Sequence, residues 1–130
     1  MKKQINAVEE FHNSFNEANG TEPKLVDMDT YDLRYRLMRE ENEEYLEACK
    51  ANDMVEVVDA LGDQLYILCG TILKHGMQHI IEDVFTEIHR SNMSKLDENG
   101  KPIFRIDGKI MKSVLYEKPN LVPIVYGKDC

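Results

Sequence analysis

The sequence predicts an all-α fold in which four helices are followed by a short β-hairpin. Apolar residues recur at steps of three and four along four successive stretches, which is the period of an amphipathic helix. From Asn92 onward this period is lost, and the hairpin-type dipeptides Asn99-Gly100 and Asp107-Gly108 occur. A chain of 130 residues has room for one domain. We expect a single domain over 1–130, with a helical core over about 4–91 and a basic flap and tail over about 92–130.

The first two helices are predicted over residues 4–18 and 29–51. The apolar stripe of the first helix consists of Ile5, Val8, Phe11, Phe15 and Ala18. Asn19-Gly20 ends this helix. Asp29 or Thr30 is expected to cap the second helix, because a side-chain oxygen there accepts a hydrogen bond from an otherwise unpaired backbone N–H. The inner face of the second helix is formed by Leu33, Leu37, Tyr45 and Ala48.

The third and fourth helices are predicted over residues 54–74 and 78–91. The third is apolar around its whole circumference, which is typical of a buried helix, and Gly76 ends it. The fourth has one apolar stripe, formed by Ile81, Val84, Phe85 and Ile88. Residues 103–106 and 109–111 flank a turn and are expected to pair as a hairpin. The tail after Pro119 is expected to be extended.

Charge and composition exclude several classes of protein. The chain carries 16 basic and 24 acidic residues, a formal net charge of −8, which argues against binding to nucleic acid. No apolar run is long enough to span a membrane, and the N-terminus lacks the apolar core of a secretory signal. The cysteines are three in number and widely spaced, so they predict neither a disulfide framework nor a metal pair. We therefore expect a cytoplasmic protein without nucleic-acid or membrane partners.

Acidic side chains lie on the predicted inner face of the second helix. On a helical wheel Glu41 and Glu44 fall inside the apolar stripe, beside Glu40, whereas Glu43 and Glu47 lie at its edge or beyond. An acidic run on a helix is usually a solvated face, but these positions do not fit that reading. A functional role for the inward-facing carboxylates is favoured.

The third helix carries Glu56, Asp59 and Asp63 on one stripe of its otherwise apolar surface. Burial of unpaired carboxylates costs several kcal/mol, so a cation held between the two helices is the economical explanation. Ligands that are all oxygen favour Mg²⁺, or Mn²⁺ as a substitute, over zinc. The number of carboxylates suggests two or more ions per site. The alternative is a purely structural polar network.

Two blocks of the chain resemble a known family. Glu40-Glu41-x-x-Glu44 followed by Glu56-x-x-Asp59 resembles the signature of the all-alpha nucleoside triphosphate pyrophosphohydrolases, which include MazG-like enzymes, dimeric dUTPases and phosphoribosyl-ATP pyrophosphohydrolases. The block SNMSKLDENGKPIFRIDGKIMKSVLYEKPNL is similar to the C-terminal segment of the MazG-like, dUTP-preferring branch. The resemblance covers about residues 8–122.

This resemblance implies a four-helix bundle that assembles as a homodimer or a dimer of dimers. It also implies Mg²⁺-dependent hydrolysis of a nucleoside triphosphate, dUTP or another dNTP, to the monophosphate and pyrophosphate, which would clean the nucleotide pool. The residues that match the metal ligands of the family are Glu41, Glu44, Glu56 and Asp59. Glu40 matches a glutamate that orients or deprotonates the attacking water. For Asp63 three roles stay open: a further ligand, an acceptor outside the ligand shell, or a partner for a cation from the C-terminal block.

Further candidates for substrate contacts lie in the flap and in the first helix. Residues 91–118 carry six basic and four acidic residues, and a cationic flap would offset triphosphate charge. The candidates in this segment are Asn92, Lys95, Lys109, Lys112 and Tyr116. A solvated hairpin is the alternative for the lysines, and a helix C-cap is the alternative for Asn92. Phe15 and His12 are candidates for nucleobase contact, with a place in the core as the alternative for Phe15.

Two other classes of function compete with the enzyme. A non-catalytic helical protein could use the same acids to bind a regulatory ion or a basic partner, but this leaves the flap sequence unexplained. A di-iron carboxylate bundle would need two Glu-x-x-His motifs, and only Glu9-x-x-His12 is present.

Overall fold

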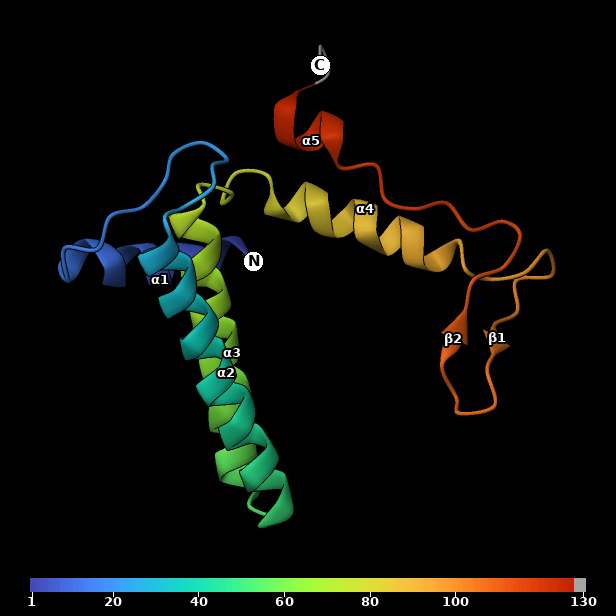
Figure 1. The fold of residues 1–130 in the computed structure, drawn as a ribbon, viewed down its shortest axis with the longest axis horizontal. Coiled ribbons are helices and arrows are strands. Elements are labelled where there is room, and N and C mark those ends of the chain that lie inside the picture. The colour runs from blue at the N-terminus through green and yellow to red at the C-terminus, as the bar shows by residue number, and fades with distance from the viewer. Residues whose placement is uncertain (128–130) are drawn as a thin grey trace. The chain divides into compact units, whose positions relative to one another are not determined.

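A computed structural model describes residues 1–127 and confirms the all-α fold class. The last three residues of the predicted tail, 128–130, lie outside the described part of the chain. Figure 1 shows the elements, which are α1 (Lys2–Ser14), α2 (Met28–Lys50), α3 (Met54–Lys74), α4 (Ile81–Met93), β1 (Ile103–Phe104), β2 (Ile110–Met111) and α5 (Val122–Tyr126). Within residues 1–127, no helix has both the length and the hydropathy to cross a membrane.

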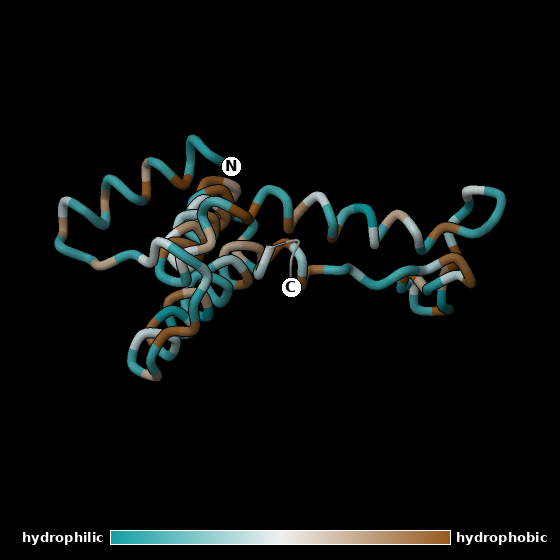
Figure 2. The backbone as a smooth tube through the Cα atoms, turned by 90° about the horizontal axis from the view of Figure 1, so that it is seen from above, coloured by the Kyte–Doolittle hydropathy of each residue, from teal (hydrophilic) through white to brown (hydrophobic). Residues whose placement is uncertain are grey.

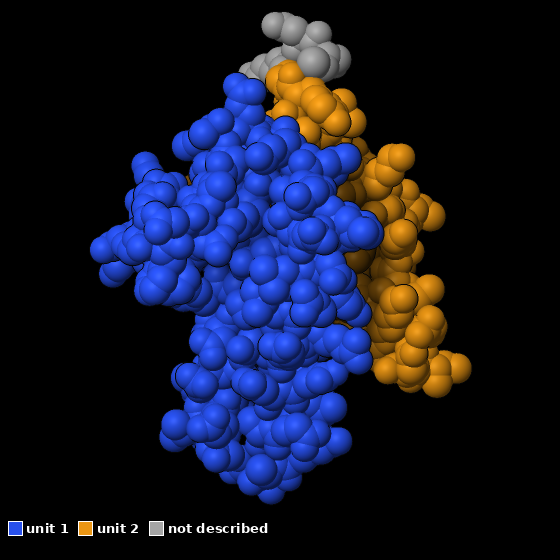
Figure 3. Space-filling model, turned by 60° about the vertical axis from the view of Figure 1, so that its left-hand side comes forward, with its two compact units in different colours: residues 1–79 blue, residues 80–130 orange. Residues whose placement is uncertain are grey.

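The chain divides into two compact units, residues 1–79 and residues 80–130 (Figure 3). The first unit contains α1, α2 and α3, and the second contains α4, the hairpin and α5. The single domain, and the packing of the fourth helix in a bundle with the other three, therefore stay predictions.

Helices α2 and α3 form an antiparallel pair that positions most of the acidic residues. Asp27 caps α2, since its carboxylate accepts a hydrogen bond from the Thr30 backbone N–H (2.9 Å), so the predicted cap at Asp29 or Thr30 was wrong by two or three residues. Asp53 caps α3 by accepting from the Glu56 backbone N–H (3.2 Å). The turn between the helices is short and places Asn52 at a φ of 53°. This tight connection sets the two helices side by side.

Helix α1 ends at Ser14, four residues before its predicted end. Asn16 adopts a φ of 60° just after it, and Lys74 donates hydrogen bonds to Glu17 (2.7 Å) and to the Ala18 carbonyl (2.8 Å). These contacts hold the chain in a loop against the C-terminal end of α3. Figure 2 shows hydrophobic segments recurring along the otherwise hydrophilic α1, which buries Ile5 and Val8.

Helix α3 is buried on one side only within this chain. Its buried residues are Ala60, Cys69, Gly70, Ile72 and Leu73. Val55 and Val58 are 75% and 62% exposed, and Leu61 is 49% exposed. The pattern typical of a buried helix is therefore only partly met within one chain, because α1 and α2 cover only part of the circumference of α3.

The second unit confirms the predicted hairpin. Ile103 pairs with Met111 and Phe104 pairs with Ile110 in antiparallel register, and Gly108 takes a φ of 87° in the turn. Helix α4 begins three residues later than predicted, at Ile81.

The tail that follows the hairpin is not fully extended. It forms α5, which has a proline in its first turn, a position where the missing N–H is not needed. The segment before α5 is held to α4, because the Ser91 hydroxyl donates to the Glu117 carbonyl (2.8 Å).

Candidate functional site

The antiparallel pairing brings acids of α2 and α3 together. Gln64 on α3 donates a hydrogen bond to the Glu41 backbone carbonyl on α2 (3.3 Å). This contact places Glu41 beside Asp63, the neighbour of Gln64. Asp59 lies one helical turn before Asp63 on the same face of α3, so its charge also acts on Glu41.

The Glu41 carboxyl lies in an environment that disfavours its charged form. Desolvation, a hydrogen bond with Glu44 and the charges of Glu44, Asp63 and Asp59 raise its pKa from 4.5 to about 7. Its Oε2 atom is buried and has no hydrogen-bond partner within residues 1–127. A buried carboxylate oxygen without a partner is costly.

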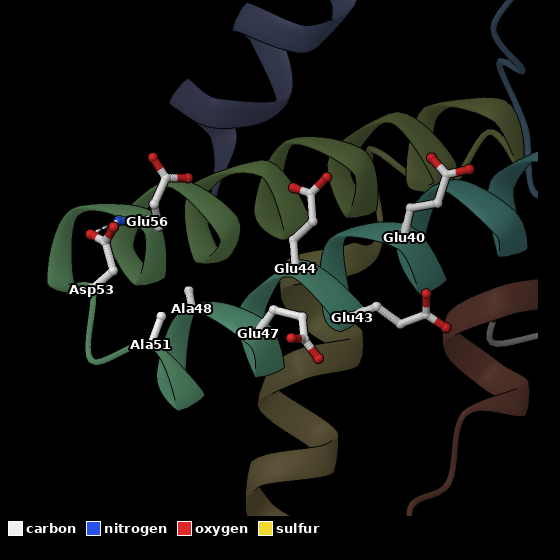
Figure 4. Close-up of a pocket in the computed structure, with 8 residues that line it drawn as sticks. All are labelled: Glu40, Glu43, Glu44, Glu47, Ala48, Ala51, Asp53 and Glu56. Atoms are coloured by element: carbon white, nitrogen blue, oxygen red, sulfur yellow. Dashed lines mark hydrogen bonds between the residues drawn. The ribbon is translucent and has the colours of Figure 1, made fainter.

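A groove of about 540 Å³ lies beside these acids. It is lined by Glu40, Glu43, Glu44, Glu47, Ala48, Ala51, Asp53 and Glu56. Figure 4 shows Glu40, Glu44 and Glu56 pointing to one side, and Glu43 and Glu47 pointing to the other. Glu44 thus belongs both to the groove and to the group of acids around Glu41.

The two sides of the groove differ in their charge pairing. Glu43 pairs with Arg39 (3.1 Å) and Glu47 pairs with Lys50 (3.7 Å). No ion pair with Lys or Arg within residues 1–127 involves five other acids, which are Glu41, Glu44, Glu56, Asp59 and Asp63. The acids predicted to be solvated therefore have cations of their own, and those predicted to be functional do not.

The donor set fits a hard divalent cation, because every candidate ligand is a carboxylate oxygen. As the side chains stand, no group of three or more His, Cys, Asp or Glu residues in the described chain is close enough to hold an ion. Glu40, Glu44, Glu56 and Asp59 are exposed, and only Glu41 and Asp63 are partly buried. Binding therefore requires rotamer changes that bring the exposed carboxylates toward the partly buried Glu41. The ligand set stays a proposal.

Of the first-helix candidates, the structure buries His12 and exposes Phe15. His12 is 4% exposed, and its Nδ1 donates to Asn19 Oδ1 (2.5 Å). Phe15 is 65% exposed, and its ring packs against Phe11 with centroids 4.5 Å apart. His12 and Phe11 line a second cavity, and Phe15 is not among its lining residues.

The flap candidates all lie in the second unit. Asn92 is exposed in the last turn of α4, and Ser94 occupies the C-cap, so the C-cap alternative for Asn92 was wrong. Lys109 directly precedes β2 and Lys112 directly follows it. The Lys112 ammonium lies over the Tyr116 ring, 4.7 Å from its centroid. The contacts of these residues and of Lys95 with phosphate stay predictions.

Sequence reasoning missed Arg34 and Lys74, which both line the second cavity. A signal was present for Arg34, because it precedes Glu41 by two helical turns and so lies on the same inward face of α2. Lys74 is the last residue of α3, and its contacts depend on the loop after α1, which no periodicity predicts.

The raised pKa of Glu41 predicts how stability depends on pH in the metal-free protein. The unfolded carboxyl loses its proton near 4.5 and the folded one near 7, so the free energy of unfolding falls as the pH rises between these values. We expect Glu41→Gln to match the wild type near pH ~4 and to exceed it near pH ~8. Denaturant unfolding in chelator measures the free energy of unfolding at each pH. The control is Glu43→Gln, which should leave the difference in stability between pH ~4 and pH ~8 as it is in the wild type. An equal stability difference at both pH values would contradict the prediction.

Comparison with known proteins gives one family match. A family model described as phosphoribosyl-ATP pyrophosphohydrolase matches residues 8–92. The matched region includes most of the helical part of the chain. It also includes the six candidate acids Glu40, Glu41, Glu44, Glu56, Asp59 and Asp63. A search among curated proteins finds no match.

Proposed function

Since the chain belongs to the phosphoribosyl-ATP pyrophosphohydrolase family, we propose that it hydrolyses a nucleoside triphosphate to the monophosphate and pyrophosphate with Mg²⁺. Membership confirms the resemblance to the all-alpha nucleoside triphosphate pyrophosphohydrolases and identifies the chain as a pyrophosphohydrolase. The preference for dUTP or another dNTP, and a role in cleaning the nucleotide pool, belong to the proposal. They rest on the similarity of residues 91–121 to the dUTP-preferring branch.

The observation that carries the proposal is the unpartnered Oε2 of Glu41 among the carboxylates of Glu44, Asp59 and Asp63. Clustered carboxylates destabilise the folded protein by themselves. Groups with strongly shifted pKa values of this kind occur preferentially at functional sites. The groove next to it supplies further carboxylates and space for a phosphate chain.

In the proposed site Glu41, Glu44, Glu56 and Asp59 hold the ions. Bound Mg²⁺ supplies positive charge that polarises phosphate oxygens and makes water more acidic. Glu40 lines the groove on the same side as Glu44 and Glu56 (Figure 4), where its carboxylate orients the attacking water and accepts its proton. Asp63 maintains the negative field around Glu41.

A substrate panel tests this function. The common NTPs and dNTPs, together with phosphoribosyl-ATP, are incubated with the protein and Mg²⁺, and the products are resolved chromatographically. We expect monophosphate and pyrophosphate from at least one substrate. Diphosphate and phosphate would show attack at a different phosphorus. Turnover of none would favour the non-catalytic alternative, in which the acids bind a regulatory ion or a basic partner.

We also propose that the protein is a homodimer or a dimer of dimers. The proposal is supported by the apolar residues of α3 that one chain leaves exposed, including Val55, Val58 and Leu61. Their burial in a two-fold interface of at least roughly 2,000 Å² is typical of obligate dimers. Light scattering at low micromolar concentration is expected to show a dimer or larger species, and Val58→Asp is expected to weaken it. A fully active 15.1 kDa monomer would refute the proposal.

A further inference from the structure

The second cavity of the first unit has a volume of about 390 Å³. It lies where α1, α2 and α3 meet and is lined by Phe11 and His12 from α1, Arg34 from α2 and Lys74 from α3. The Phe11 ring is 42% exposed and packs edge-on against Tyr66, with centroids 5.6 Å apart. The cavity therefore combines a supported aromatic surface with cationic and polar side chains and with the acids Glu17 and Asp29. An apolar surface with a few polar groups is a common composition of ligand sites.

Arg34 is held in a fixed position at this cavity. Its Nε donates to the Thr71 hydroxyl (3.0 Å), and one of its Nη atoms donates to the Ile67 carbonyl (2.7 Å). Gly70 makes room for it, because a Cβ at this position would lie 2.5 Å from the same Nη atom. The half-buried guanidinium is thus oriented by three residues of α3, and its position requires glycine at 70.

Three other polar side chains of the cavity are already paired, and Asp29 and Thr30 also line it. Lys74 binds Glu17 (2.7 Å), and His12 donates to Asn19 (2.5 Å). Arg34 has no ion pair with a carboxylate among residues 1–127, and its two hydrogen bonds leave guanidinium N–H donors over. Burial lowers the Arg34 pKa, and the charge of Glu17 only partly opposes this. A ligand in this cavity would have to offer hydrogen-bond acceptors to Arg34.

The cavity and the acidic site lie along the same face of α2. Arg34 precedes Glu41 by two helical turns, so the two residues share a face of α2, roughly 10 Å apart along the axis. This separation is close to the length of a nucleoside from its 5′ oxygen to the far edge of its base. A nucleotide with its phosphates at the acids and its base directed toward the N-terminal end of α2 would reach Arg34.

We propose that Arg34 donates a hydrogen bond to a carbonyl oxygen of the nucleobase and thereby selects keto bases over amino bases. This inference rests on the proposed function. A carbonyl at C4 of uracil or C6 of hypoxanthine accepts from a guanidinium, as keto oxygens do in arginine contacts with guanine. The amino group of cytosine or adenine at the same position turns a donor toward a donor, and the buried N–H is left unpaired.

Two matched substrate pairs test the proposal whatever the size of the preferred base. Within each of the pairs dUTP/dCTP and dITP/dATP, the bases differ in the keto or amino group and in the hydrogen on the adjacent ring nitrogen, and in nothing else. We expect wild-type kcat/KM to favour the keto member of the preferred pair by at least about tenfold, the scale of a lost hydrogen bond to a charged group. Arg34→Met should bring this ratio close to one, and Arg34→Lys should leave an intermediate ratio.

Arg36→Met is the matched control, because Arg36 is exposed on the same helix and pairs with Asp32 (3.3 Å). It should keep the wild-type ratio. Each ratio is measured within one variant, so partial loss of folded protein does not change it. A wild-type ratio near one, a preference for the amino base, or an unchanged ratio in Arg34→Met would overturn the proposal while leaving the hydrolytic function intact.

Binding separates failure of this inference from failure of the proposed function. Equilibrium dialysis with dUMP and dCMP, and with dIMP and dAMP, reports base selection without turnover. If no triphosphate is hydrolysed, the function is refuted, and the monophosphate ratios in wild type and Arg34→Met still decide whether Arg34 reads a keto oxygen. Equal binding within both pairs would then refute the inference as well.

Discussion

In excess chelator the protein is expected to lose all measurable hydrolysis of its substrate, and added Mg²⁺ or Mn²⁺ is expected to restore it. The groove acids and the substrate phosphates are all negatively charged. Among the described residues, Glu41 and the acids around it have no Lys or Arg ion-pair partner. Without a cation, the carboxylates of the site and the phosphates of the substrate would repel one another. Release of pyrophosphate with and without metal measures the effect.

The control for this experiment is the fold itself. Helical circular dichroism in chelator should remain, because the caps, the α2–α3 packing and the loop contacts of Lys74 do not involve a metal. Sustained hydrolysis in excess chelator would remove the metal mechanism. Loss of helicity together with activity would show that the ion is structural.

The second large effect is expected from neutral replacement of the proposed ligands. Each variant should lower kcat by at least about 10²-fold, the scale of losing an electrostatic element at a reaction centre. The variants are Glu41→Gln, Glu44→Gln, Glu56→Gln and Asp59→Asn. Metal-free stability should stay the same or rise in each, because one repelling charge is removed. Steady-state kinetics and denaturant unfolding measure the two quantities.

Glu43→Gln is the matched control for these variants. Glu43 directly precedes Glu44, lines the same groove and points to its other side (Figure 4), where Arg39 pairs with it (3.1 Å). We expect near wild-type kcat for this variant. Strong destabilisation of all four metal-free ligand variants, with no specific loss of kcat, would support a structural polar network instead.

The helices α2 and α3 were predicted to within one residue at each end, and the hairpin was placed correctly. An aspartate directly precedes each of these helices. It caps the helix by accepting a hydrogen bond from the backbone N–H three residues later. Such signals are local and can be read from a single sequence. The end of α1 was wrong, because Lys74, which lies far along the chain, holds Glu17 and Ala18 in a loop.

Periodicity also separated the acids that share a face from those that do not. It placed Glu41 and Glu44 inward and Glu43 and Glu47 outward. Glu41 is partly buried but Glu44 is exposed, and the outward pair finds Arg39 and Lys50 on the same helix. Both pairs form at steps of three or four residues, which a helical wheel reproduces.

The sequence by itself determined the fold class, the long helices and the acids that face the same way. Only the tertiary structure decided which of these acids is short of partners, and that is Glu41, whose Oε2 is buried and whose pKa rises to about 7. The same holds for the position of the Arg34 guanidinium, which needs the space that Gly70 leaves. Helix period and capping depend on neighbours within a few residues, whereas burial and electrostatic environment depend on segments that meet only when the chain packs.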